Sequence, residues 1–147
     1  MMRHHLILRV ITKLLVGAIM LFAFYVQFHG DFSPGGGFQA GVIMAVAFIL
    51  YGLVFSLHNV QRVFPPWLVH KLVALGVLIY AGTGVVSMFL GYTFLDYGSF
   101  VPSHPSSGQH YGILVVELGV GVTVTAVMVA IYYAFAGRPP RLSDEEW

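Results

Sequence analysis

The sequence predicts an all-α integral membrane protein with four transmembrane helices. Of its 147 residues, 58% are hydrophobic and only 9% are charged, whereas soluble domains carry roughly 25% charged residues. Four apolar segments are about as long as the 20 residues that a helix needs to cross a hydrocarbon core of about 30 Å. We expect spans at about residues 6–28, 37–57, 67–90 and 110–136, which together form one transmembrane domain over residues 1–137.

The first span, residues 6–28, begins with two cations one helical turn apart, Arg9 and Lys13. The charged start resembles the n-region of a signal peptide, but no small-residue cleavage site follows the apolar run, so we expect an uncleaved anchor. From Lys13 to His29 the helix covers only about 24 Å, which is less than a full crossing. We therefore expect Arg9 and Lys13 to reach toward one membrane surface or to face protein.

A glycine-rich stretch, "HGDFSPGGGFQAG", leads into the second span. Ser33 followed by Pro34 is typical of a helix start, because a hydroxyl at the N-cap accepts a free backbone N–H and proline at the first helical position needs no donor. Gly35, Gly36 and Gly37 would then open the helix, and each costs about 1 kcal/mol relative to alanine in a helix interior.

Two roles could offset that cost. Gly37, Gly41 and Ala45 recur every four residues, a pattern that lets a neighbouring helix backbone approach closely in a membrane. Alternatively, free N–H groups or unwound carbonyls at this helix start contact an ion or water, with His29 and Asp31 beside them. The sequence leaves both roles open.

The third span, residues 67–90, follows a sharp break. Pro65 and Pro66 end the preceding segment, because proline cannot continue a helix and restricts the residue before it. His70 and Lys71 follow Trp67 at the start of the span. These two residues are either an interfacial pair that reaches toward the headgroups or a contact for a proton or a partner.

The fourth span, residues 110–136, contains the most informative polar residue, Glu117. An ionised acid that faces lipid costs about 2.5 to 3.5 kcal/mol, so such residues normally face protein or water. Gly121 and Thr125 follow Glu117 at intervals of four residues, and His110 precedes it by seven, which places all four on one helix face. Glu117 is therefore either a protonatable or cation-binding carboxylate or a residue that pairs with a neighbouring helix for assembly.

The distribution of Lys and Arg predicts the orientation. The loops at residues 29–37 and 91–109 contain neither residue, whereas basic residues lie before and at the start of the first span, between the second and third spans, and after the fourth. By the positive-inside rule, both termini face the cytoplasm. Residues 138–147 then form a short cytoplasmic tail.

Other chemistry has no support in the sequence. It contains no Ser-His-Asp arrangement, paired catalytic carboxylates, phosphate cradle or basic aromatic stripe, so we expect neither an enzyme nor a nucleic-acid-binding protein. No histidine pair has metal-ligand spacing on an expected helix, so we expect no metal site and no cofactor. One intramembrane acid is too few polar groups for a self-sufficient exchanger. The sequence therefore favours one component packed within a larger complex, in contact with membrane lipids.

Two segments resemble the MnhB family of Mrp-type Na⁺/H⁺ antiporter components. The first is "HGDFSPGGGFQAGVIMA", in which Pro34 to Phe38 form a block directly before a spanning helix. The second is "HYGILVVELGVGVTVTAVM" in the last span, which is similar to a family helix where an acidic residue precedes a Gly-Val pattern. The resemblance makes Pro34 to Phe38 signature positions and matches Glu117 to the acidic position.

This resemblance implies a small subunit of a multi-subunit antiporter in the prokaryotic plasma membrane, which exchanges cytoplasmic Na⁺ for external protons. Its partners would be the other antiporter subunits, and the transported Na⁺ and H⁺ would be the only ligands. Two alternatives stay open: an Mrp-like subunit of a membrane-bound hydrogenase or related complex, and a purely structural assembly subunit.

The candidate site residues fall into two groups. The ion-path candidates are Glu117, His110, Thr125, Asp31, His29 and Lys71. The helix-start and packing motif consists of Ser33, Pro34, Gly35, Gly36, Gly37, Phe38 and Gly41.

Overall fold

The fold consists of helices joined by short connections. The computed structural model describes residues 6–30 and 35–138. Over these residues it contains α1 (Leu6–Phe28), α2 (Gly37–Phe55), α3 (Leu57–Val63), α4 (Pro66–Phe89), the 3-10 helix η1 (Tyr97–Phe100) and α5 (Pro105–Ala136), and no strand. Of these helices, α1, α2, α4 and α5 are long and apolar enough to cross a membrane. The predicted all-α membrane fold with four spans is therefore confirmed.

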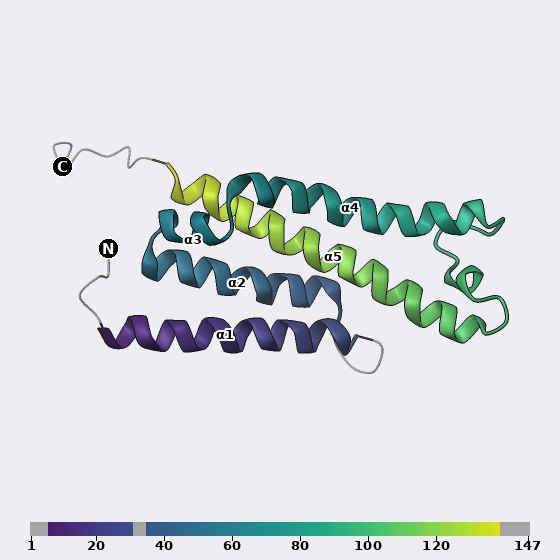
Figure 1. Cartoon of the computed structure of the whole chain (residues 1–147), viewed down its shortest axis with the longest axis horizontal. Coiled ribbons are helices and arrows are strands. Elements are labelled where there is room, and N and C mark those ends of the chain that lie inside the picture. The colour runs from purple at the N-terminus through teal and green to yellow at the C-terminus, as the bar shows by residue number, and fades with distance from the viewer. Residues whose placement is uncertain (1–5, 31–34, 139–147) are drawn as a thin grey trace, which may run out of the picture.

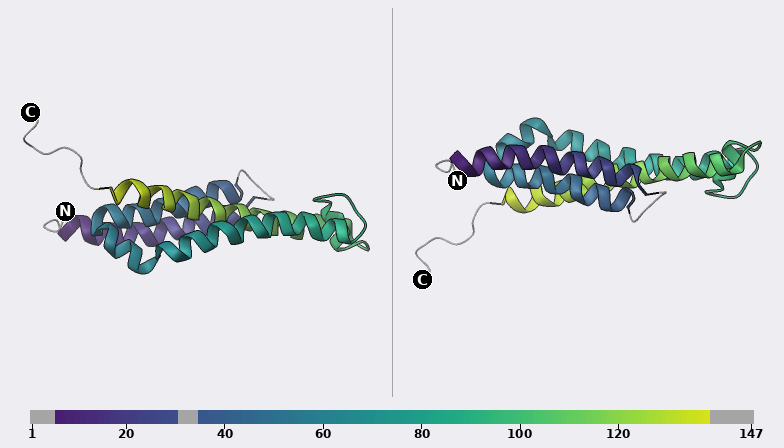
Figure 2. Two further views of the ribbon diagram at one scale, coloured as in Figure 1. Left: turned by 90° about the horizontal axis from the view of Figure 1, so that it is seen from above. Right: turned by 90° about the horizontal axis from the view of Figure 1, so that it is seen from below.

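The four long helices lie side by side in the order α1, α2, α5, α4 (Figure 1). Within this array α1 packs against α2, α2 against α5, and α5 against α4. The views from above and below show that the array is thinner in the direction perpendicular to the plane of Figure 1 (Figure 2). The chain runs in the same direction in α2 and α5 (Figure 1). The start of α1 and the end of α5 lie at the same end of the molecule, as four crossings require, and which membrane surface this end faces stays a prediction.

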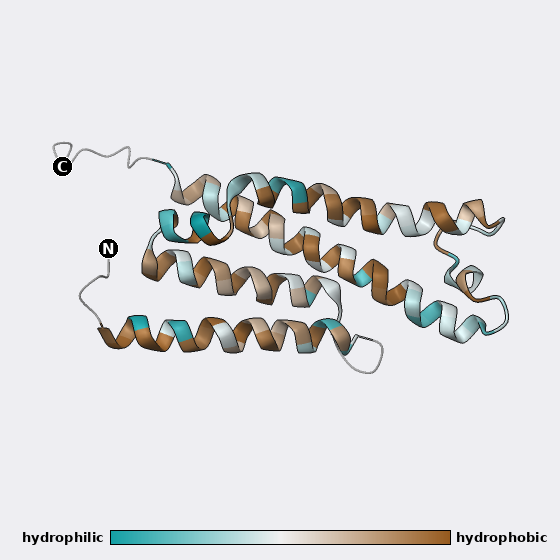
Figure 3. Cartoon of the chain, viewed as in Figure 1, coloured by the Kyte–Doolittle hydropathy of each residue, from teal (hydrophilic) through white to brown (hydrophobic). Residues whose placement is uncertain are grey.

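The α4–α5 hairpin extends beyond the α1–α2 hairpin at the other end of the molecule (Figures 1 and 2). α5 has 32 residues and α2 has 19, which correspond to helix lengths of about 48 Å and 28 Å. The first turns of α5 carry hydrophilic residues, unlike the mostly apolar helix that follows (Figure 3). α5 begins at Pro105 rather than near residue 110, because proline is tolerated at the first helical position.

The segment between the second and third spans is partly helical before the break at Pro65 and Pro66. α2 ends at Phe55 because Ser56 has a φ of 110°, which a helix cannot accommodate. The chain then re-enters a helix, α3, where the Asn59 side-chain amide donates to the carbonyl of Phe55 at 2.7 Å. Val60 is fully buried, so this short helix is fixed by packing as well as by its hydrogen bonds.

The start of α2 also differs from the prediction. The helix begins at Gly37, three residues after Pro34, and Gly36 has a φ of 133° that favours glycine. Gly35 and Gly36 therefore precede the helix and do not carry the cost of glycine in a helix interior. The N–H of Gly36 donates to the carbonyl of Val26 at the end of α1, at 3.4 Å. Ser33 and Pro34 lie outside the described residues.

A buried cluster joins α2, α4 and α5 in the half of the molecule where α1 begins. Phe64, in the connection between α3 and α4, stacks on Phe48 of α2 with ring centroids 4.6 Å apart. The hydroxyl of Tyr133 on α5 donates to the carbonyl of Phe64 at 2.6 Å. The buried members of the cluster are Ala45, Phe64, Val69, Ala126 and Val129.

Candidate functional site

The carboxylate of Glu117 lies over the turn between α1 and α2. A Cβ atom built on Gly30 would lie 2.6 Å from Oε2 of Glu117 and 2.8 Å from Oε1. A Cβ atom built on Gly36 would lie 3.1 Å from Oε1. The carboxylate therefore occupies space that two glycines leave open. Glu117 and the glycine stretch, which the sequence presented as separate candidates, form one site.

The backbones of α2 and α5 touch directly below this site. A Cβ atom on Gly37 would overlap the carbonyl oxygen of Glu117, and one on Gly41 would lie 2.8 Å from the carbonyl oxygen of Gly121. Ala45, one turn further along α2, is fully buried. Small residues at these three α2 positions are therefore what allow α5 to bring Glu117 against the turn.

Two amide side chains lie near the carboxylate and were not among the predicted site residues. Oε1 of Gln39 would lie 3.4 Å from a Cβ on Gly36, the glycine that also approaches Glu117. Oε1 of Gln27 would lie 2.5 Å from a Cβ on Gly121, one turn along α5, and Gln27 is only 8% exposed. Gln27 is the first polar side chain after Lys13 in an apolar span, apart from the tyrosine hydroxyl of Tyr25, a signal that could have identified it.

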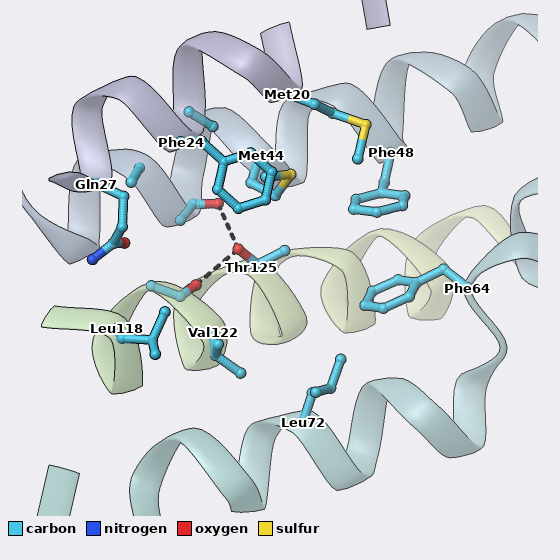
Figure 4. A pocket seen from close by; sticks show the side chains of 14 residues that line it. Met20, Phe24, Gln27, Met44, Phe48, Phe64, Leu72, Leu118, Val122 and Thr125 are labelled. Carbon is cyan, nitrogen blue, oxygen red and sulfur yellow. Dashed lines mark hydrogen bonds between the residues drawn. The ribbon is translucent and has the colours of Figure 1, made fainter. Parts of the chain in front are cut away.

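Thr125 extends the polar face of α5 toward the interior of the array. Its hydroxyl lies 2.8 Å from the carbonyl oxygen of Gly121 on its own helix and 3.1 Å from that of Gly41 on α2, so it donates across the α2–α5 contact (Figure 4). Glu117, Gly121 and Thr125 therefore face α1 and α2 together. The face predicted from their spacing is the face on which α5 meets those helices.

An apolar groove of about 300 Å³ opens beside this polar face. Side chains from α1, α2 and α5 converge on it, with Leu72 of α4 and Phe64 closing its far side (Figure 4). Gln27 and Thr125 supply the polar side chains in its lining, and the other lining side chains are apolar or absent. The labelled apolar residues are Met20, Phe24, Met44, Phe48, Phe64, Leu72, Leu118 and Val122.

The other ion-path candidates are distributed over the molecule. The His29 ring stacks on Tyr25 with centroids 4.3 Å apart, directly before Gly30. His110 lies two turns of α5 from Glu117, about 10 Å along the helix axis. Asp31 lies outside the described residues. Phe38, from the predicted motif, is 62% exposed and so is not buried in the α2–α5 contact.

Lys71 is not part of the Glu117 site. Its Nζ lies over the Trp67 ring at 5.0 Å from the centroid, and both side chains are exposed at the start of α4. Further along α4, a Cβ on Gly76 would overlap the Thr123 hydroxyl, and Thr123 is six residues beyond Glu117 on α5. Lys71 therefore lies in the opposite half of the molecule from Glu117, in the arrangement expected of an interfacial pair.

The connection between α4 and α5 folds back onto the protruding hairpin. The Phe94 ring packs against the backbone of Gly84 on α4, and the Tyr97 side chain packs against the backbone of Gly112 on α5. The Asp96 carboxylate accepts the N–H of Gly98 at 3.2 Å and so orders the start of η1. Burial, together with the nearby Tyr80, raises the pKa of the Tyr97 phenol above its ordinary value of 10.0. Tyr97 is therefore neutral at physiological pH.

Within the described ranges, no group of three or more His, Cys, Asp and Glu side chains is arranged to hold a metal ion. Among the described residues, the Glu117 site offers one carboxylate beside amide and backbone oxygens. Such a group can take up a proton or a monovalent cation.

Comparison with known proteins shows the family to which this chain is similar. Residues 7–130 match the family model described as a domain related to the MnhB subunit of Na⁺/H⁺ antiporter. A Staphylococcus haemolyticus protein named "Putative antiporter subunit mnhB2" is 37% identical over 139 residues, which cover 93% of this chain and 98% of that protein. Proteins of the same name from Staphylococcus epidermidis and Staphylococcus aureus are each 34% identical over the same shares of both chains.

Proposed function

The chain belongs to the MnhB family and is a membrane subunit of a multi-subunit Na⁺/H⁺ antiporter, and we propose that it supplies part of the wall of the ion path, with Glu117 as the group that contacts the ion. The complex would lie in the prokaryotic plasma membrane, with both termini of this subunit in the cytoplasm. The names of the relatives favour this assignment over a hydrogenase-type complex.

The observation that carries the proposal is the position of the Glu117 carboxylate over Gly30 and Gly36. A carboxylate in a spanning helix is expensive unless it faces protein or water, and here it packs against the backbone of two residues that have no side chains. Non-helical backbone at such a site is typical of ion-binding positions in transporters. The glycines thus let the Glu117 carboxylate lie directly against this non-helical backbone.

The oxygen donors around Glu117 suit Na⁺ and protons. The carboxylate is negatively charged when ionised, and the amide oxygen of Gln39 lies beside the same glycine. Gln27 of α1 provides a second amide, which lies beside Gly121, one turn along α5 from Glu117. We assign Glu117 the exchange of a proton for Na⁺, and the two amides the role of oxygen ligands for the partly dehydrated cation.

This chain would form one wall of the path and not the whole path. Of the residues that the structure describes, Asp96 and Glu117 are the two acids, and Asp96 lies in the loop outside the spans. The groove beside the site is lined almost entirely by apolar side chains, and such a lining does not conduct ions. The remaining polar groups of the path must come from neighbouring subunits.

The proposal is tested by replacing Glu117 with Gln in the intact complex. The substitution keeps the size of the side chain but removes the titratable charge. If an ion contact of about 1.5 to 3 kcal/mol is lost, Na⁺-driven pH change in inverted vesicles slows about 10- to 150-fold. The yield of assembled complex, measured on a native gel, should be unchanged.

Asp96→Asn is the matched control. It makes the same acid-to-amide change, and the Asn side-chain oxygen can still accept the N–H of Gly98 that Asp96 accepts. We expect exchange at the wild-type rate in this variant. Full exchange by a normally assembled Glu117→Gln complex would remove Glu117 from the ion path and leave the chain with an assembly role.

A further inference from the structure

Two cationic side chains share one aromatic ring at the end of the molecule where α1 begins. The Arg9 guanidinium carbon lies 5.4 Å from the centroid of the Phe55 ring, and Nζ of Lys13 lies 5.8 Å from it. Tyr51, one turn before, stacks on Phe55 with centroids 4.8 Å apart. Arg9 and Lys13 are both exposed. The aromatic stack therefore holds two positive charges side by side, facing outward.

The position of Phe55 sets the depth of this pair in the membrane. Phe55 is the last residue of α2, so the pair lies where the spanning part of the α1–α2 hairpin ends. Trp67 and Lys71 form a similar aromatic and cation pair at the start of α4. Aromatic residues and long cationic side chains at span ends lie at the level of the lipid headgroups.

The charges of the described residues are divided between the two ends of the molecule. The two described acids, Asp96 and Glu117, lie in the other half, toward the α1–α2 turn and the long loop. No acidic residue in the described ranges therefore neutralises Arg9 and Lys13. The described Lys and Arg residues, which all lie at the end with the pair, are Arg9, Lys13, Arg62, Lys71 and Arg138.

The cationic pair also lies in line with the apolar groove of about 300 Å³. Met20 lines the groove and is seven residues after Lys13, and Phe48 lines it and is seven residues before Phe55. Seven residues are almost two full turns, so Met20 lies on the same face of α1 as Lys13, and Phe48 lies on the same face of α2 as Phe55. Each separation is about 10 Å along the helix axis. That distance is less than one leaflet's share of a hydrocarbon core of about 30 Å.

We propose that this face binds one anionic phospholipid, whose phosphate contacts Arg9 and Lys13 and whose acyl chain enters the groove between Met20 and Phe48. A cationic head and an apolar groove at membrane depth together fit an amphiphile with a negative headgroup. An acidic peptide segment fits the pair alone and leaves the groove unexplained. Basic pockets between transmembrane helices are known to recognise anionic headgroups in this manner.

The test uses the whole purified complex in nanodiscs of phosphatidylcholine. The probe is a trace of phosphatidylglycerol with a photoactivatable diazirine in the middle of one acyl chain. A phosphatidylcholine probe with the same acyl chain is the control. Mass spectrometry of the peptides from this chain should find the phosphatidylglycerol crosslinks around Met20, Phe24 and Met44. The zwitterionic probe should label these residues only weakly.

Two variants with equal loss of charge separate binding by the pair from general attraction to a basic surface. Arg9→Gln with Lys13→Gln should lower the phosphatidylglycerol crosslinks in the groove by about 30-fold, given the attraction expected of each basic residue near a membrane surface. Arg62→Gln with Arg138→Gln, which removes two charges outside the pair, should leave them unchanged. Recovery of the complex from each variant is compared first, on a native gel.

Several results would overturn the inference. Equal labelling of the wild-type groove by both lipid probes would show that the headgroup is not recognised, and this comparison needs no variant. If both double variants lose the phosphatidylglycerol crosslinks equally, the lipid is attracted by the basic surface in general and not by Arg9 and Lys13. Crosslinks that miss the groove, or a groove shielded from both probes by a helix of another subunit, would show that the acyl chain does not lie there. None of these measurements depends on exchange activity.

Discussion

Replacement of Gly37 by alanine should separate α2 from α5 and weaken assembly of the complex. A Cβ atom at this position would overlap the carbonyl oxygen of Glu117 and lie 2.7 Å from its carbonyl carbon. Ordinary contacts of a Cβ atom fall between 3.4 and 4 Å. The obstructing atoms belong to the backbone of α5, so no side chain can rotate away. The two helices must instead move apart, because the interior is close-packed and offers the added methyl group no other space.

The cost of this movement follows from the packing it disrupts. Insertion of one methyl group into a well-packed contact typically costs about 1 to 3 kcal/mol. Each 1.4 kcal/mol is a factor of ten in an equilibrium, so the folded and assembled population should fall about 5- to 150-fold relative to its unassembled form. The same change moves the Glu117 main chain, and with it the carboxylate over Gly30 and Gly36.

The assay compares the level of assembled complex on a native gel and its melting temperature in detergent with those of Gly17→Ala. Gly17 lies on α1, where a Cβ atom meets nothing within 4 Å inside this chain. Alanine there improves helix propensity by about 1 kcal/mol without steric cost from this chain. Gly17→Ala should therefore melt at or above the wild-type temperature, whereas Gly37→Ala should melt below it. A Gly37→Ala complex with wild-type yield and melting temperature would refute the close-contact account of the glycine motif.

Three further outcomes are expected. Gly30→Ala should displace the movable Glu117 carboxylate, since the added Cβ would lie 2.6 Å from Oε2, so vesicle exchange should fall while complex yield stays normal. Thr125→Val should lower the melting temperature slightly, by the equivalent of about 0.6 kcal/mol for a hydrogen bond between membrane helices, with Thr125→Ser restoring it. Gly84→Ala should push away the Phe94 ring that packs there, which would show as faster proteolysis of the loop at residues 90–104 with little change in exchange.

The sequence was sufficient to predict the spans because their signal is local. Length and hydropathy identify a spanning helix without knowledge of its neighbours, and the four long helices fall close to the expected residues. The helix termini depend on backbone geometry and were less accurate. The positive φ of Ser56 ends α2 before the predicted residue 57. α5 begins at Pro105, before the predicted residue 110, because its first turns are polar and hydropathy does not mark them as part of a span.

The site could be predicted only in parts, because it joins residues from distant points of the chain. The spacing of Glu117 and Thr125 identified one face of α5, and that of Gly37 and Gly41 identified one face of α2. Helical periodicity cannot say which faces meet. The contact follows from the order α1, α2, α5, α4 in the array, in which the second and fourth spans are neighbours. Gln27 belongs to the site because α1 also contacts α5, where the Gln27 side chain approaches Gly121.

The two functions weighed for the glycine stretch can be separated by experiment, because two of its glycines make different contacts. Gly37 contacts the backbone of α5, so a side chain there forces two helices apart, whereas Gly30 contacts the end of the flexible Glu117 side chain, which can move at little cost to packing. If the motif serves assembly alone, Gly30→Ala should leave both yield and exchange intact. If it also positions Glu117 for an ion, exchange should fall in Gly30→Ala complexes whose yield and melting temperature are normal. Loss of yield in Gly37→Ala together with loss of exchange alone in Gly30→Ala would assign both roles to the same short stretch of chain.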